Sequence, residues 1–301
     1  MIRIATWFSP RRQLLLLAAL CLHGAWAQAY DRLVYPLSVG LDSRYEYDWA
    51  VLRMALDKSR AQFGAYSLHQ ATTSMSPPRI TQELLMPTGH INILVRATAP
   101  ELERQFLPVR IPVDRGLLGY RVFLVRRDDL PRFAAVHTLN DLRRLRAGLG
   151  KDWIDVPVLR AAGLPTEEGS AYEGLFSMLE AGRFDYFSRG ADEALREYDE
   201  RRATHPKLAI EPTLLLHYPL PRYFFLRRDA EGKRLAARIE AGMEIMVRDG
   251  SLNTLFQRYK GATIAAANLK QRRLLTIPNP TLSPHTPLSR SELWFDPLNG
   301  K

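Results

Sequence analysis

The 301-residue chain has a single cysteine, Cys21, and no apolar run long enough to cross a bilayer. Its seven histidines show no spacing typical of metal ligands, and there is neither a G-x-S-x-G nucleophile motif nor a phosphate-binding P-loop. No two carboxylates stand at a spacing that indicates acid–base catalysis, and Asp185, in a short predicted strand, is better explained as a structural hydrogen-bonding group. We therefore expect no metal, no cofactor and no catalytic residue.

The first 27 residues have the pattern of a secretory signal peptide. A basic start is formed by Arg3, Arg11 and Arg12. A short apolar stretch follows from Leu14 to Leu22, and Ala25-Trp26-Ala27 is a small-x-small cleavage motif. The bulky Leu20 argues against a lipid anchor on Cys21. The sequence thus predicts export to the periplasm with cleavage near Ala27, which would remove the only thiol. An uncleaved anchor is the alternative.

The chain is basic, with 42 Lys and Arg residues, 32 Asp and Glu residues and a formal net charge of +10. Cleavage of residues 1–27 would remove three arginines and leave 39 basic against 32 acidic residues, a net charge of +7. A solvated cationic surface, or attraction to anionic polymers of the cell envelope, accounts for this excess. We therefore expect no nucleic-acid partner.

Predicted strands and helices alternate along the chain, which favours βαβ units and a mostly parallel sheet. Thr138 and Asp229 are predicted to cap helices, and Gly64 and Gly261 to end them. The strands are expected at residues 33–41, 66–71, 91–95, 120–125, 146–149, 184–187, 209–216 and 223–227. The helices are expected at residues 46–63, 79–86, 138–145, 155–162, 170–181, 192–202 and 251–259, and a long helix is expected to begin at Asp229 and to turn Leu235, Ile239, Met243 and Met246 inward. From residue 264 onward, several prolines predict an extended tail.

The stretch from Ser170 to Gly190 is the part of the sequence where we expect a ligand. Ser170 and Glu173 match a capping box, and Gly182 can end the helix that they begin. Residues 184–187 then predict an aromatic strand, followed by Ser188-Arg189-Gly190 as a loop at its carboxyl end. Ligands of open α/β sheets bind outside the carboxyl ends of strands, so this loop is a candidate binding site.

The order of these elements resembles the type II periplasmic solute-binding proteins, and within them the polar-amino-acid type of extracellular solute-binding protein family 3. The resemblance covers roughly residues 33–261. It depends on Thr98 with Glu103-Arg104 after an apolar strand, the Gly148…Gly150 turn, the LEAGRFDYF run and the DGSLNTLFQRYKG ending.

The resemblance implies an α/β fold with two lobes, joined by two crossing hinge strands in a "Venus flytrap" arrangement. Lobe 1 would comprise residues 28–120 and 222–263, and lobe 2 residues 121–221. Residues 264–301 lie beyond the resemblance, and we expect them to form a proline-rich extension packed on lobe 1, with Trp294 and Phe295 as anchors, because two large aromatics near a terminus seldom stay in water. Arg110 and Arg121 flank the first crossing and are assigned to the basic surface.

Family members of the amino-acid-binding type hold the ligand's carboxylate with an arginine, which Arg104 matches. They hold the ligand's amino group with an aspartate after the second-lobe strand, where this chain has Arg189 and, as the nearest acid, Asp192. The usual Thr or Ser at the Gly148 turn is missing, and Trp153 stands nearby. These departures favour an anionic or aromatic ligand over a standard α-amino acid.

The candidate ligand-binding residues each have a structural alternative. The two arginines could clamp a carboxylate or pair with neighbouring acids, and Ser170 could be only a helix cap. The aromatic residues could stack on a ligand or pack in the core. The full set is Arg104, Arg189, Thr98, Trp153, Ser170, Tyr172, Tyr45, Tyr47 and Asp192.

The sequence therefore predicts an exported, monomeric solute-binding protein, which would capture a small polar or anionic molecule between its lobes for an ABC-type transporter or a receptor. Two alternatives stay open. One is a dehydratase-like periplasmic enzyme on the same scaffold, since fold does not determine function. The other is a sensory or partner-binding module in which residues 264–301 make the contact.

Overall fold

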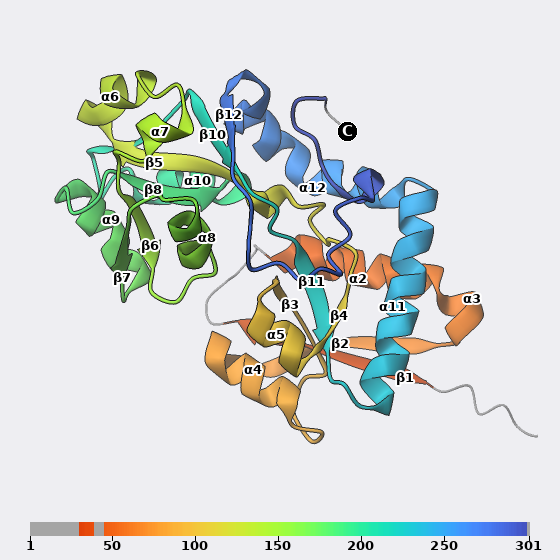
Figure 1. The fold of residues 1–301 in the computed structure, drawn as a ribbon. Helices are drawn as coiled ribbons and strands as arrows, with labels where there is room; N and C mark the ends of the chain where they lie inside the picture. The colour runs from red at the N-terminus through yellow and green to blue at the C-terminus, as the bar shows by residue number, and fades with distance from the viewer. Residues whose placement is uncertain (1–29, 39–44, 300–301) are drawn as a thin grey trace, which may run out of the picture.

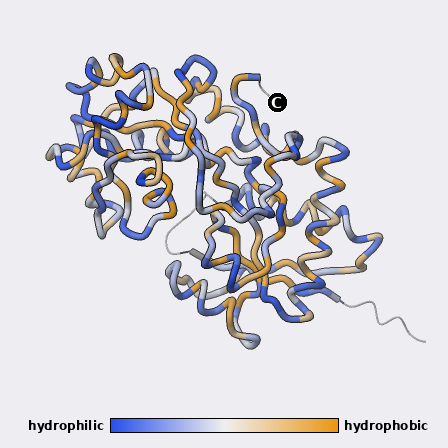
Figure 2. Tube along the Cα trace, viewed as in Figure 1, coloured by the Kyte–Doolittle hydropathy of each residue, from blue (hydrophilic) through white to orange (hydrophobic). Residues whose placement is uncertain are grey.

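The structure is a computed structural model that describes residues 30–38 and 45–299 (Figure 1). The predicted signal peptide lies outside these residues, as does the end of the first predicted strand. None of the helices within the described ranges is both long and apolar enough to cross a membrane. The described chain forms two lobes, of which lobe 1 is built on two small sheets and lobe 2 on one larger sheet. Apolar residues run through both lobes (Figure 2).

Lobe 1 contains five strands. Strands β1 (Asp31–Ser38) and β2 (Tyr66–Met75) pair in parallel, while β11 (Arg222–Leu226) lies between β3 (Ile93–Ala97) and β4 (Leu107–Val109), antiparallel to both. The Asn92 side chain links the two groups, because it accepts a bond from the Val34 amide (2.8 Å) and donates one to the Arg32 carbonyl (2.7 Å).

The helices of lobe 1 are α2 (Glu46–Lys58), α3 (Arg60–Phe63), α4 (Pro77–Leu85), α5 (Pro100–Gln105) and α11 (Ala230–Arg248). The α2 and α11 helices pack closely, since a Cβ on Gly242 would lie 1.9 Å from the Ala55 carbonyl oxygen. Asp229 caps α11 by accepting a bond from the Gly232 amide, as predicted.

Lobe 2 has a mixed sheet with the strand order β12-β10-β5-β8-β6-β7, and β9 also pairs with β5. Its strands are β5 (Tyr120–Arg126), β6 (Ala147–Gly150), β7 (Thr166–Gly169), β8 (Tyr186–Gly190), β9 (Leu208–Ile210), β10 (Leu214–His217) and β12 (Arg273–Thr276). The expectation of a mostly parallel sheet is wrong, because the entering strand β5 runs antiparallel to β8, β9 and β10.

The helices of lobe 2 are α6 (Leu130–Ala134), α7 (Leu139–Leu142), α8 (Asp155–Ala161), α9 (Tyr172–Glu180) and α10 (Ala191–Arg201). The predicted cap at Thr138 is confirmed as a capping box with Asp141. The predicted box at Ser170 is wrong, because α9 starts one residue later than it requires. Ala171 takes the N-cap position and makes no side-chain bond.

Helix α12 (Ser251–Ala267) packs against α10 of lobe 2 and against α2 and α11 of lobe 1. It runs through Gly261, which was predicted to stop it, and ends at Asn268 in the left-handed conformation. A helical glycine costs only about 1 kcal/mol relative to alanine, and the alanine-rich turn that follows favours helix.

The C-terminal segment (residues 269–299) contacts both lobes rather than lobe 1 alone. Its strand β12 joins the lobe 2 sheet in parallel with β10. Further on, the Phe295 ring lies 5.2 Å from that of Phe256 in α12 and 6.2 Å from that of Tyr120. Phe295 therefore packs against aromatic rings as expected, but the segment first joins the sheet of lobe 2 through β12 before it reaches them.

Candidate functional site

Two short crossings connect strands of the two lobes, in addition to the later passage from α11 through α12 to β12. The first runs from β4 to β5 through residues 110–119, and the second runs from β10 to β11 through residues 218–221. They are bonded to each other, since the Tyr218 amide donates to the Gly119 carbonyl (3.2 Å) and the Val113 amide to the Arg222 carbonyl (2.9 Å). The crossings thus meet as a pair at the junction of the two lobes.

A cavity of about 60 Å³ lies beside these crossings and is lined by residues from both lobes. Lobe 1 and α12 supply an aromatic ring and two cations, and helix α10 of lobe 2 supplies two carboxylates and a third cation. The lining residues are Tyr45, Arg222, Lys260, Asp192, Glu193 and Arg196. Three positive and two negative side chains therefore converge on one small space.

Arg222, at the start of β11, is one of two largely buried cations in this site, the other being Lys260. Its Nη2 donates to Asp48 Oδ2 (2.7 Å), and its guanidinium carbon lies 5.3 Å from the centre of the Tyr45 ring. Its Nε is buried and has no hydrogen-bond acceptor among the described residues. A buried donor without a partner is costly, so this Nε is a natural point of attachment for an anion.

The Asp48 carboxylate pairs with Arg222, and burial makes this carboxyl easier to protonate than usual. Burial raises the pKa of Asp48 to about 6, although Arg222 opposes the shift. Burial would in turn lower the pKa of Arg222, but Asp48 and the other acids nearby raise it above its ordinary value. Arg222 therefore stays cationic, and Asp48 is ionised at neutral pH but takes up a proton at a higher pH than an exposed aspartate.

Lys260 of α12 bridges to lobe 2. Its Nζ lies 2.6 Å from Asp192 Oδ2 at the start of α10, and 5.5 Å from the centre of the Tyr47 ring in α2. Tyr47 is fixed by its hydroxyl, which donates to the Val113 carbonyl (2.7 Å). The predicted residues Tyr47 and Asp192 thus lie on either side of Lys260, a residue that the sequence analysis missed.

Arg189 lies in the wall of lobe 2, and the prediction that residues 188–190 form a loop is wrong. These residues belong to β8 and are buried, because β5 pairs with β8 as far as Gly190. The Arg189 guanidinium donates to both oxygens of Glu197, each at 2.7 Å.

Three aromatic rings surround the Arg189 guanidinium. They belong to Trp153, Phe187 and Tyr172, at 4.8, 5.0 and 5.8 Å from its central carbon to the ring centres. The predicted residues Trp153 and Tyr172 thus contact the predicted arginine. Together they form a box around it and do not line the cavity between the lobes.

Arg104, Thr98 and Ser170 do not line this cavity either. Arg104 is an exposed residue of α5 paired with Glu101, and its side chain is 64% accessible. Thr98 is buried and its hydroxyl donates to Glu103 Oε1 (2.5 Å), while Ser170 is exposed ahead of α9. Of the nine predicted residues, Tyr45 and Asp192 are the two that line the cavity.

Arg121 was assigned to the surface, but its side chain is only 3% accessible. It bonds to Asp155 at the start of α8 and to the Tyr218 hydroxyl in the second crossing. Arg121 Nη1 also lies 3.9 Å from Glu193. Burial would raise the pKa of Glu193, yet Arg189 and Arg121 lower it to about 2, so this cavity carboxyl is ionised at neutral pH.

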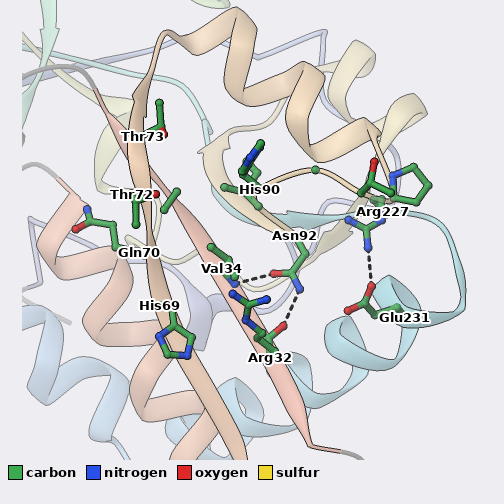
Figure 3. A pocket seen from close by; sticks show the side chains of 15 residues that line it. Arg32, Val34, His69, Gln70, Thr72, Thr73, His90, Asn92, Arg227 and Glu231 are labelled. Carbon is green, nitrogen blue, oxygen red and sulfur yellow. Dashed lines mark hydrogen bonds and ion pairs between the residues drawn. The ribbon is translucent and has the colours of Figure 1, made fainter.

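A larger cavity of about 540 Å³ lies on lobe 1 alone, over β1 and β2 (Figure 3). Some of its polar residues are engaged with the fold. Asn92 joins β1 to the start of β3, and Arg227 pairs with Glu231 (2.6 Å) and Asp229 (2.7 Å). None of the predicted site residues lines it. No group of three potential metal ligands occurs within the described ranges.

No protein-family model matches the chain, and no curated protein matches it. Several solved structures, however, align with the chain. A histidine kinase sensor domain with similarity to periplasmic binding proteins aligns over 77% of this chain and 97% of its own, with 17% identity and a TM-score of 0.51. An ancestral arginine-binding protein bound to arginine (16% identity, 75% and 97% coverage) and an ancestral amino acid-binding precursor of cyclohexadienyl dehydratase (13% identity, 75% and 94% coverage) each give a TM-score of 0.49.

At 17% identity and a TM-score of 0.51, the alignment with the sensor domain establishes the fold alone. The chain has the two-lobed α/β fold of periplasmic binding proteins, with two crossings between the lobes, and the fold predicted from the sequence is confirmed.

Proposed function

We propose that this protein is an exported solute-binding protein of the type II periplasmic class, which holds a small anionic or zwitterionic molecule between its lobes. Amino-acid-like molecules and organic acids are the candidate ligands, and an ABC-type permease or a receptor is the candidate partner. The observation that carries the proposal is the Arg222 Nε, a buried donor that finds no acceptor among the residues the structure describes, in a cavity that both lobes line.

The charges around the cavity support an anionic group as the main determinant. Arg222, Arg196 and Lys260 outnumber the carboxylates of Asp192 and Glu193. Glu193 is already engaged by Arg189 (3.1 Å) and by the Gly190 amide (3.1 Å). A ligand carboxylate bound by guanidinium and ammonium groups in a site shielded from water would make charge-assisted hydrogen bonds.

The size of the cavity indicates that binding requires the lobes to part. Pockets for small molecules usually enclose about 300–1,000 Å³, and this cavity has about 60 Å³. The Lys260–Asp192 pair closes it between α12 and α10. Hinge closure of two lobes around a ligand is a common mode of binding in such folds.

Calorimetry with a panel of amino acids and organic acids tests the proposal. Arg196→Gln and Lys260→Gln each remove a cavity cation, and Arg222→Gln is made together with Asp48→Asn so that no unpaired buried carboxylate remains. Loss of one charge-assisted hydrogen bond, about 1.5–3 kcal/mol, should weaken binding roughly 10- to 100-fold.

Two exposed arginines serve as controls. Arg202→Gln, just after α10 with a side chain 63% accessible, and Arg104→Met should both bind like the parent. The proposal fails if the three cavity variants also bind like the parent. It fails as well if no solute of the panel binds and native mass spectrometry of the purified protein finds no bound small molecule.

A dehydratase-like enzyme is the second candidate, favoured by the raised pKa of Asp48 beside a cavity cation. Perturbed carboxyls of this kind occur at catalytic sites as well as in structural pairs. Incubation with cyclic hydroxy acids, followed by mass spectrometry, distinguishes the two. Product that disappears in Asp48→Asn supports the enzyme, and binding without turnover supports the solute-binding protein.

A further inference from the structure

The C-terminal segment begins with a firm attachment to lobe 2. Strand β12 keeps parallel register with β10 from Leu214↔Arg273 to His217↔Thr276. The Arg273 amide also donates to the Thr213 carbonyl (2.6 Å), and Ile277 is buried in the core of lobe 2. This end of the segment is therefore part of the lobe 2 sheet.

Beyond β12 the segment follows the second crossing. The Ile277 amide donates to the His217 carbonyl (2.9 Å), and the Asn279 side-chain amide donates to the Pro219 carbonyl (2.9 Å). Pro278 and Pro280 flank Asn279. Because proline fixes its own φ and restricts the residue before it, the chain is stiff where it holds this crossing.

The far end of the segment holds the first crossing. The Phe295 amide donates to the Arg115 carbonyl (2.7 Å), and the Phe295 carbonyl accepts a bond from the Tyr120 hydroxyl (3.1 Å). Gly116, in the same crossing, has a φ of +75°, and a Cβ there would lie 2.5 Å from the Trp294 ring. Arg290 adds a two-point ion pair to Glu244 of α11, at 2.6 and 3.0 Å.

These contacts fall on the backbone that a hinge has to move. In two-lobed proteins a few residues in the crossings absorb the φ and ψ changes of opening. Here the carbonyls of His217, Pro219 and Arg115 are acceptors for the C-terminal segment, so rotation of those peptide groups would break its bonds. Opening therefore competes directly with the attachment of the segment.

We propose that the C-terminal segment is a hinge restraint, which clamps both crossings and limits how far the lobes open until part of it detaches. The restraint acts in the chain without ligand, so its test does not depend on the proposed solute. The same contacts would restrain the cleft whatever it binds.

Distance measurements between the lobes test the restraint without any ligand. In the full chain with Cys21→Ser, nitroxide labels are placed at Gln82→Cys in α4 and Ala134→Cys in α6, both exposed positions. Pulsed electron–electron double resonance then compares the distribution of label-to-label distances in Asn279→Ala and in Phe295→Ala with that in the parent. Each variant should show an additional population at longer distance that the parent lacks.

Leu288→Ala is the matched control within the segment, because Leu288 is 53% exposed and should leave the distribution unchanged. Circular dichroism identifies variants that keep the parent fold. Should Phe295→Ala fail to fold, Asn279→Ala decides, since this change removes side-chain hydrogen bonds and not a buried ring. A folded Asn279→Ala whose distances match those of the parent overturns the proposal.

Discussion

Replacing Arg189 by methionine tests whether this arginine supports the fold of lobe 2. The side chain of its partner Glu197 is 0% accessible and receives two bonds of 2.7 Å from the guanidinium. Removing one member of a buried pair leaves an uncompensated charge, which costs about 3–5 kcal/mol. Arg189→Met should therefore lower the melting temperature by on the order of 10 °C.

A double-mutant cycle separates the lost pair from general disruption. Glu197→Leu in the Arg189→Met background removes the fully buried charge, while Glu193, the other partner of Arg189, keeps the Gly190 amide (3.1 Å) and Arg121 (3.9 Å). The methionine sulfur can pack against Trp153 and Phe187. Since apolar replacement of a whole buried pair is often nearly neutral, the double variant should recover most of the lost stability. Urea denaturation at pH 7 measures all four corners of the cycle.

Arg104→Met is the control, because it also removes an arginine from an ion pair, but one whose two side chains are 64% and 69% accessible. Exposed pairs of this kind contribute about 0–1 kcal/mol. A structural role for Arg189 is refuted if Arg189→Met unfolds at the same urea concentration as Arg104→Met, or if the double variant is no more stable than Arg189→Met alone.

Two further predictions concern the crossings. Burial lowers the pKa of His217 from 6.5 to about 4, with Asp296 opposing, so the unfolded chain binds a proton that the folded chain resists. The free energy of unfolding should fall as the pH drops from about 6.5 to 4. His217→Phe should make the free energy of unfolding, measured by urea titration, less dependent on pH over this range. An unchanged pH dependence would contradict the lowered pKa of His217. Asp48, whose pKa is raised, changes the stability in the opposite direction, equally in parent and variant. Gly116→Ala should destabilise the protein more than Gly250→Ala, because both glycines have a positive φ but only the first would press a Cβ against Trp294. Thermal unfolding followed by tryptophan fluorescence compares them, and equal melting temperatures would rule out the clash.

Local signals in the sequence were sufficient for most of the elements. Thr138 with Asp141 and Asp229 with Gly232 form the predicted caps, because a cap depends on residues within one turn. The alternation of strands and helices and the two strand-like borders of the middle segment were likewise enough for the two-lobed fold. Where a local signal was misleading, as at Gly261, the surrounding helix outweighed it.

The site was decided by the tertiary structure. Residues 188–190 read as a loop, yet pairing with β5 extends β8 through them and turns Arg189 into a core residue. Asp48 and Arg222 are 174 positions apart and meet only because β11 returns to lobe 1. Which arginine faces the junction depends on such long-range pairing, and no residue spacing in the sequence encodes it.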